Sequence, residues 1–175
     1  MTGSVNDIAR QIRLLIVDID GVMTDGGLQF DNRGEEYKTF NSLDGHGIRM
    51  LLDCGIEIAV ITGRNSGIVN HRMNELGVRH IYQGYRDKLQ AYEKLLQDTG
   101  LESGQTAYVG DDLPDLPVMR RVGLAIAVQN AHVFVKQHCD WVTTARGGNG
   151  AVREVTDFIL QAQSLLAARQ DSYLE

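Results

Sequence analysis

Cysteine is scarce in this chain of 175 residues, and the two that occur, Cys54 and Cys139, stand far apart without a CxxC motif or a cysteine/histidine cluster. This spacing indicates neither a disulfide framework nor a zinc knuckle. Unpaired thiols are typical of proteins in a reducing compartment, so we expect a cytoplasmic location.

Long apolar runs and an excess of positive charge are also missing. No segment approaches the roughly 20 apolar residues that span a bilayer, and residues 1–13 are too polar for a signal peptide. The 17 Lys and Arg residues are outnumbered by 23 Asp and Glu residues, and the two signs are mixed along the chain. We therefore expect neither a nucleic acid nor a membrane surface as the main partner.

The chain does have the composition of a folded protein, with 43% hydrophobic and 23% charged residues, and its length suits one domain over residues 1–175. Short apolar runs at residues 14–17, 56–61, 106–109 and 125–128 predict strands that are covered on both faces. Segments with helical spacing lie between them, and Gly77 and Gly100 are placed as helix stops. This alternation predicts an α/β fold with a doubly wound parallel sheet.

Two segments interrupt the alternation. Residues 24–40 contain two short strand-like pieces around a turn from Asp31 to Gly34, which predicts an inserted β-hairpin that projects from the sheet edge. Residues 146–168 contain a glycine-rich loop followed by an amphipathic helix, beyond which we expect the tail to fray. Too few residues separate the strands for a separate cap domain, so the sequence predicts a Rossmann-like domain with a hairpin flap.

Acidic residues follow the first and third apolar runs. Asp18 and Asp20 stand one residue apart after the first run, and Asp111, Asp112 and Asp115 follow the third. Aspartate also favours turns and helix starts. Each group alone therefore leaves a structural and a catalytic interpretation open.

A hydroxyl and two basic side chains occupy comparable positions. Thr62 and Arg64 flank a glycine after the second run, where they could cap a helix or hold an anion. Lys88 opens an amphipathic helix, where a lysine is usually solvated. In a doubly wound sheet, however, all these segments lie at the carboxyl edge. We therefore expect the acids, the hydroxyl and the ammonium to meet in one crevice.

Carboxylates in one crevice repel each other by about 4 kcal/mol for a pair about 4 Å apart at an effective dielectric of about 20. A cation must offset this repulsion, and ligands that are all oxygens favour Mg²⁺ over zinc. Carboxylate, hydroxyl, ammonium and Mg²⁺ together suit phosphoryl transfer, with an aspartate as nucleophile. The carboxylate of Asp115 could orient the ammonium of Lys88 through an ion pair. Asp112 has no assigned role.

Four motifs stand in the order Asp18-x-Asp20, Thr62, Lys88 and Gly110-Asp111-Asp112-x-x-Asp115. This order resembles the haloacid dehalogenase superfamily of phosphatases. The resemblance implies that Asp18 is the nucleophile and Asp20 the general acid/base, and that Thr62 and Lys88 hold the phosphoryl group. It also implies that Mg²⁺ binds Asp18, the Asp20 carbonyl and Asp111.

More narrowly, residues 20–27, 34–49, 61–64, 108–119 and 147–155 are similar to the family of 3-deoxy-D-manno-octulosonate 8-phosphate phosphatases. This resemblance implies an acid sugar phosphate as substrate, a role in lipopolysaccharide precursor biosynthesis, and a homotetramer. The hairpin and the glycine-rich segment of neighbouring subunits are candidates to close the pocket. Arg64 and Arg72 are candidates to bind the substrate carboxylate.

Two other functions use similar residues. A phosphatase for a nine-carbon nonulosonate 9-phosphate stays open as an alternative, because its motifs are nearly the same. A response-regulator receiver also gathers Asp, Thr and Lys around Mg²⁺, but in receivers the lysine comes last. Here Lys88 precedes Asp111, so the order argues against a signalling module.

Overall fold

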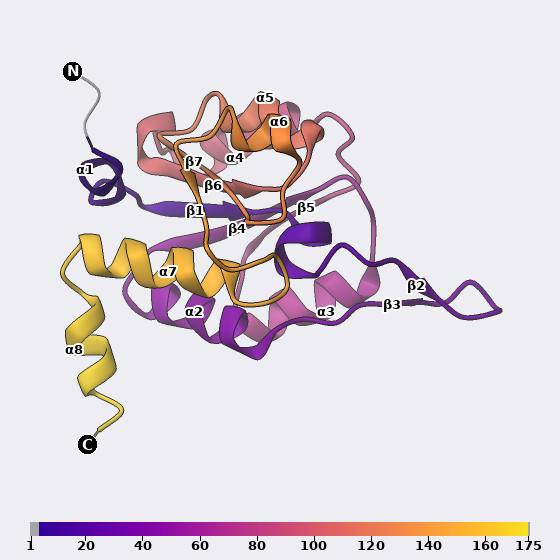
Figure 1. Ribbon diagram of the computed structural model, residues 1–175, viewed down its shortest axis with the longest axis horizontal. Coiled ribbons are helices and arrows are strands. Elements are labelled where there is room, and N and C mark those ends of the chain that lie inside the picture. Colours follow the sequence, from indigo (N-terminus) through magenta and orange to yellow (C-terminus); the bar gives the residue numbers. More distant parts are fainter. Residues whose placement is uncertain (1–3, 175) are drawn as a thin grey trace.

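A six-stranded sheet forms the centre of the computed structural model, which describes residues 4–174 (Figure 1). All its strand pairs are parallel, in the spatial order β5-β4-β1-β6-β7-β8. The strands are β1 (Leu14–Val17), β4 (Glu57–Thr62), β5 (His80–Gln83), β6 (Thr106–Gly110), β7 (Leu124–Ala127) and β8 (Trp141–Val142). The predicted α/β fold with a parallel sheet is therefore confirmed.

Helices cover both faces of this sheet (Figure 1). One face carries α2 (Ser42–Asp53), α3 (Gly67–Leu76) and α7 (Ala151–Ala162), and the other carries α4 (Lys88–Thr99), α5 (Leu116–Met119) and α6 (Val133–Lys136). The short helices α1 (Val5–Ala9) and α8 (Leu166–Asp171) lie near the two ends of the chain. In the described part of the chain, no helix is both long and apolar enough to cross a membrane.

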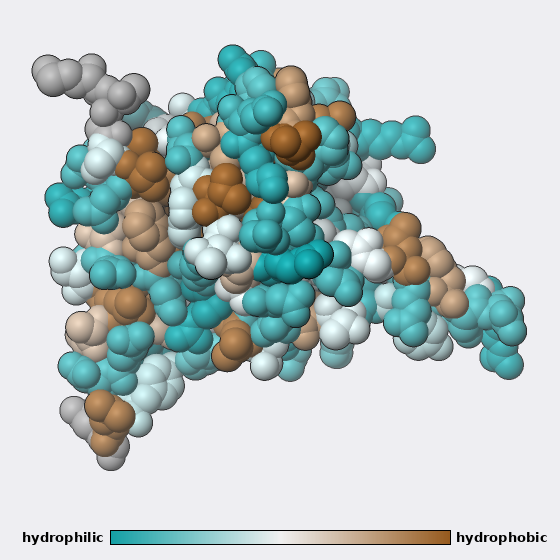
Figure 2. Space-filling model, viewed as in Figure 1, coloured by the Kyte–Doolittle hydropathy of each residue, from teal (hydrophilic) through white to brown (hydrophobic). Residues whose placement is uncertain are grey.

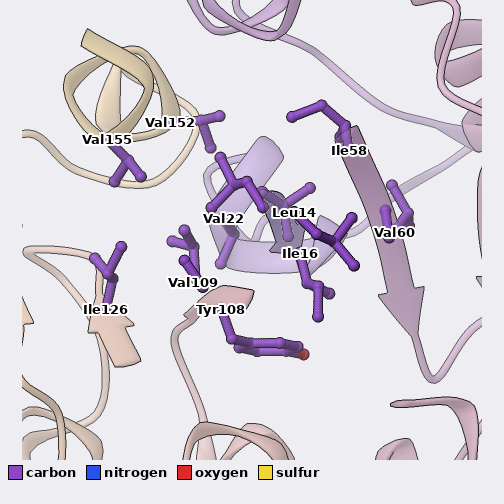
Figure 3. Close-up of a cluster of buried hydrophobic side chains, with 14 of the residues drawn as sticks. Leu14, Ile16, Val22, Ile58, Val60, Tyr108, Val109, Ile126, Val152 and Val155 are labelled. Atoms are coloured by element: carbon purple, nitrogen blue, oxygen red, sulfur yellow. The ribbon is translucent and has the colours of Figure 1, made fainter. Parts of the chain in front are cut away.

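The core lies on both sides of β1, one of the two strands at the centre of the sheet (Figure 3). All four residues of β1 are fully buried. Val22, Ile58, Val109 and Val152 belong to the same apolar cluster. Because burying one such side chain contributes about 1.5–3 kcal/mol, this packing holds the carboxyl end of β1 in a fixed place.

Several details of the secondary structure differ from the prediction. The strands β5 and β8 were not predicted, because they are short, partly exposed edge strands without a continuous apolar run. Gly77 and Gly100 do end helices, with φ of 83° and 68°. The predicted helix up to residue 168 is broken at Ser164, where φ is 61°, and the chain then forms α8 instead of fraying.

The inserted hairpin consists of β2 (Gln29–Phe30) and β3 (Glu36–Tyr37), which pair antiparallel and project from the body (Figure 1). Its turn closes through Gly34 N–H, which donates to the Asp31 carbonyl at 3.0 Å, as the sequence predicts. Leu28, Phe30 and Tyr37 on this arm are all about half exposed. Figure 2 shows the resulting hydrophobic stretch along the projecting arm.

Candidate active site

The turn after β1 places Asp18 and Asp20 at the carboxyl edge of the sheet. Gly21 within this turn has φ of 96°, and a Cβ atom built there would lie 2.1 Å from Asp111 Oδ2. The Gly21 N–H donates to Thr24 Oγ1 at 3.3 Å. Only a glycine therefore allows the Asp111 carboxylate to approach the turn so closely.

Lys88 is buried among carboxylates at the start of α4. Its Nζ lies 2.9 Å from Asp18 Oδ1 and 2.6 Å from Asp115 Oδ1, and its side chain is 5% exposed. Burial lowers the pKa of Lys88, but the charges of Asp18 and Asp115 outweigh this effect and raise it. Lys88 is therefore a permanently charged, buried residue of the site, and it is not a solvated surface lysine.

Asp115 holds Lys88 in place with a carboxylate that uses both oxygens. Oδ1 accepts hydrogen bonds from Lys88 Nζ and, at 2.7 Å, from the Tyr108 hydroxyl. Oδ2 accepts from the backbone N–H groups of Asp111 at 2.9 Å and Asp112 at 3.1 Å. The structure thus confirms that Asp115 orients Lys88.

Asp112, which the sequence left without a role, caps a short helical turn. Its Oδ1 accepts a hydrogen bond from the Leu113 N–H at 2.8 Å. This turn, over Leu113–Asp115, carries Pro114 in its first positions, where a missing N–H costs nothing.

The electrostatics of Asp18 and Asp111 fit a divalent cation. The pKa of Asp18 is raised to about 6, mainly by burial. The charge of Lys88 lowers this pKa and the charge of Asp115 raises it. Burial followed by the charges of Asp18 and Asp115 raises the pKa of Asp111 to about 7. One carboxylate oxygen from each of these three aspartates lies within 4.8 Å of the others.

The same carboxylates differ in their capacity to bind an ion. Asp18 Oδ1 is buried and, apart from its charge contact with Lys88, has no hydrogen-bond partner among the described residues. Both oxygens of Asp115 are already engaged by donors. Asp18 and Asp111 are therefore the carboxylates that fit Mg²⁺, an ion that prefers oxygen ligands.

A pocket of about 400 Å³ gathers the predicted side chains. Its lining includes Asp18, Asp20, Thr62, Arg64, Lys88 and Asp111. Leu28 lines it from the hairpin side. A second hollow of about 430 Å³, bordered by Arg49 and Gly77, lies at the opposite edge of the sheet and contains none of these residues.

Arg72 does not line this pocket, in contrast to the prediction. It lies in the second turn of α3, where its Nη1 donates to Glu75 Oε2 at 2.8 Å. A Cβ atom on Gly45 would lie 2.2 Å from Arg72 Nη2, which shows that the guanidinium packs against α2. The helix phase therefore directs Arg72 away from the pocket, and Arg64 is the arginine that remains there.

The glycine-rich segment before α7, a candidate to close the pocket of a neighbouring subunit, is anchored within its own chain. Gly148 N–H donates to the Val22 carbonyl at 2.9 Å, and a Cβ atom on Gly147 would lie 1.7 Å from the Gly21 carbonyl oxygen. The segment therefore packs against the turn after β1 of its own chain. Asp44 of α2 completes this region by accepting hydrogen bonds from the N–H groups of Gly150 at 3.3 Å and Arg153 at 2.8 Å.

Two charged residues of the hairpin that were not predicted from the sequence also reach the pocket residues. Lys38 pairs with the carboxylate of Asp20, and Glu36 pairs with Arg64. Lys38 Nζ also lies 3.3 Å from Glu36 Oε1. A lysine directly after a short hairpin strand has no signal of its own in the sequence, because this contact depends on how the hairpin folds back.

Comparisons with known proteins agree with this geometry. The model of the haloacid dehalogenase-like hydrolase family matches residues 77–155. The 3-deoxy-D-manno-octulosonate 8-phosphate phosphatase KdsC of Yersinia pestis is 51% identical over 158 residues, which cover 90% of this chain and 84% of that protein. The KdsC protein of Escherichia coli K12 is 50% identical with the same coverage.

A solved structure is similar over almost the whole chain. It is the 3-deoxy-D-manno-octulosonate 8-phosphate phosphatase of Moraxella catarrhalis in complex with a magnesium ion, a phosphate ion and KDO. Its TM-score is 0.95 at 42% identity, and the match covers 97% of both chains. Together, the sheet, the aspartate cluster and these relatives show that the chain belongs to the haloacid dehalogenase-like hydrolases, in the family of the 3-deoxy-D-manno-octulosonate 8-phosphate phosphatases.

Proposed function

We propose that this protein is a Mg²⁺-dependent phosphatase that hydrolyses 3-deoxy-D-manno-octulosonate 8-phosphate to the free acid sugar and phosphate. The observation that carries the proposal is the buried contact of Lys88 with Asp18, beside Asp111. The relatives named for this activity support the choice of substrate, which belongs to lipopolysaccharide precursor biosynthesis.

The reaction passes through an aspartyl-phosphate on Asp18. A carboxylate oxygen of Asp18 attacks the phosphorus, and the bond from phosphorus to the sugar oxygen breaks. The leaving oxygen keeps the electron pair and takes a proton from Asp20. Water then attacks the phosphorus, gives a proton to Asp20 and releases phosphate as the Asp18–phosphorus bond breaks.

The other residues of the pocket bind and neutralise charge. Thr62 and Lys88 hold the phosphoryl oxygens, and Arg64 binds the carboxylate of the acid sugar. Asp18, Asp111 and the Asp20 carbonyl would hold Mg²⁺, which supplies charge neutralisation when it is bound. In this arrangement Asp20 would offer its backbone carbonyl to the ion and keep its side chain for proton transfer.

We also propose that the protein forms a homotetramer in which neighbouring subunits complete the pocket. The chain forms a single capless unit, and the half-exposed Leu28, Phe30 and Tyr37 give the projecting hairpin an apolar surface for contact with another copy. Light scattering after size-exclusion chromatography tests the assembly, and a fully active monomer would contradict it. We further propose a cytoplasmic location, where the free Cys54 and Cys139 stay reduced.

Phosphate release tests the function directly. The wild-type protein should hydrolyse 3-deoxy-D-manno-octulosonate 8-phosphate in the presence of Mg²⁺, with higher kcat/KM than for a nine-carbon nonulosonate 9-phosphate assayed beside it. Asp18→Asn should abolish release from both, because an amide is a poor nucleophile. Activity retained by that variant would contradict the mechanism, and preference for the nine-carbon substrate would contradict the substrate assignment.

A further inference from the structure

Lys38 is a buried cation in an otherwise exposed arm. It follows β3 directly, and its side chain is 2% exposed, whereas Phe30 and Tyr37 of the same hairpin are both 52% exposed. An ammonium group taken out of water costs several kcal/mol unless carboxylates compensate it. Lys38 meets this requirement through two partners, Asp20 and Glu36.

The contact with Asp20 is specific for one carboxylate oxygen. Lys38 Nζ donates to Asp20 Oδ1, and this is the only side-chain hydrogen bond that any residue in 4–174 makes to this carboxylate. Arg64 Nε faces the other oxygen, Oδ2, at 3.7 Å, beyond hydrogen-bond distance. Lys38 therefore fixes the orientation of the Asp20 carboxylate. The other oxygen, Oδ2, faces Arg64 and accepts no hydrogen bond from a described side chain.

Glu36 gives Lys38 a fixed position in turn. Its carboxylate bridges the ammonium of Lys38 and the guanidinium of Arg64, so two cations and two carboxylates alternate at the base of the arm. The Arg64 guanidinium also lies 5.8 Å from the centre of the Phe30 ring. The placement of the hairpin and the orientation of Asp20 are thereby coupled through Lys38.

We propose that Lys38 is a positioning residue for phosphoryl transfer, which acts by holding Asp20 so that its free oxygen faces the leaving group. The inference rests on the proposed function. When the bond from phosphorus to the leaving oxygen breaks, the proton moves from Asp20 to that oxygen, and Lys38 itself transfers nothing. The benefit therefore depends on how much the leaving group needs a proton.

Leaving groups of different basicity separate this role from a structural one. A sugar alkoxide needs a proton as it departs, whereas p-nitrophenolate is stable without one. The quantity to compare is kcat/KM, because it covers the steps up to departure of the alcohol and excludes hydrolysis of the aspartyl-phosphate. A lysine that only anchors the hairpin has no reason to affect one leaving group more than the other.

Lys38→Met keeps the aliphatic length and removes the charge, and Lys38→Arg keeps the charge. With Lys38→Met, kcat/KM should fall about tenfold or more for an alkyl phosphate, a part of the 10²–10⁴-fold that a general acid contributes. It should change by less than about threefold for p-nitrophenyl phosphate. Lys38→Arg should recover most of the alkyl phosphate activity. Lys94→Met, on the exposed face of α4, is the matched control and should match the wild type.

A double-mutant cycle completes the test. Because Lys38 acts through Asp20, Lys38→Met should add little to the loss already caused by Asp20→Asn. Equal losses on both substrates, unchanged activity, or losses that multiply in the double variant would each overturn the proposal. Thermal melts confirm that the variants are folded. The ratio of kcat/KM between the alkyl phosphate and p-nitrophenyl phosphate tests the role of Lys38. The Asp18→Asn assay tests the proposed function separately.

Discussion

Replacement of Asp115 by asparagine should destabilise the protein strongly, although the two side chains have almost the same shape. All four groups that surround this carboxylate are donors: the Lys88 ammonium, the Tyr108 hydroxyl and two backbone N–H groups. The amide nitrogen in Asp115→Asn must face one of the two donor pairs. Facing the backbone N–H groups, the amide nitrogen removes two hydrogen bonds; facing the other pair, it removes the bond from Lys88, whereas the Tyr108 hydroxyl can turn to accept from it. Either orientation also removes the charge that pairs with Lys88.

The expected cost follows from the burial of these groups. A hydrogen bond to a charged group contributes about 1.5–3 kcal/mol, and removal of one partner from a buried ion pair costs about 3–5 kcal/mol. A smaller effect acts in the other direction, because the charge of Asp115 raises the pKa values of Asp18 and Asp111. We therefore expect a loss of about 3 kcal/mol in the free energy of unfolding.

Urea denaturation with a chelator present measures this loss without the contribution of bound metal. The matched control is Asp157→Asn, which breaks the partly exposed pair of Arg153 Nε and Asp157 Oδ1, 2.8 Å apart on α7. That pair should cost about 0.5 kcal/mol or less. If the midpoint of Asp115→Asn equalled that of the control, the described hydrogen-bond network would not hold the site together.

Two further predictions concern the metal site. Gly21→Ala should lower Mg²⁺ affinity about tenfold or more, because the added Cβ would meet Asp111 Oδ2. Calorimetry measures the affinity. The control is Gly34→Ala, which lies in open space on the hairpin at a similar positive φ and should keep the wild-type affinity. Without metal, the free energy of unfolding should fall as the pH rises from about 4 to about 7. The pKa values of about 6 for Asp18 and about 7 for Asp111 are raised in the folded state. The folded state therefore binds more protons than the unfolded state in this range. Thermal melts with chelator from pH 5 to 8 should show a steeper decline for the wild type than for Asp111→Asn, and equal slopes would contradict the assigned repulsion.

The sequence predicts the place of the site because parallel strands leave little choice. Once β1, β4 and β6 are adjacent, residues directly after them, such as Asp18 and Asp111, must share one edge. The position of Lys88 follows less directly, from the motif order. Its two carboxylate contacts are visible only when α4 is packed on the sheet.

The arrangement of the remaining residues depends on packing that local patterns do not encode. Arg72 was misplaced because distance along the chain says nothing about which face of α3 meets α2. Lys38 was not predicted because the sequence does not define the angle at which the hairpin leaves the body, and this angle brings the ammonium to Asp20. Residues on strand ends are therefore predictable, and residues on inserted arms are not.

The packing of the glycine-rich segment against the turn after β1 affects the order in which the protein can mature. The backbone around Gly21 receives its support from Gly147 and Gly148, which a ribosome adds long after Gly21. Contacts between such distant parts of a chain form slowly, since a long loop must close first. A growing chain can therefore pair strands of its sheet before the turn that carries Asp18 and Asp20 is supported, and the site takes its shape after the sheet.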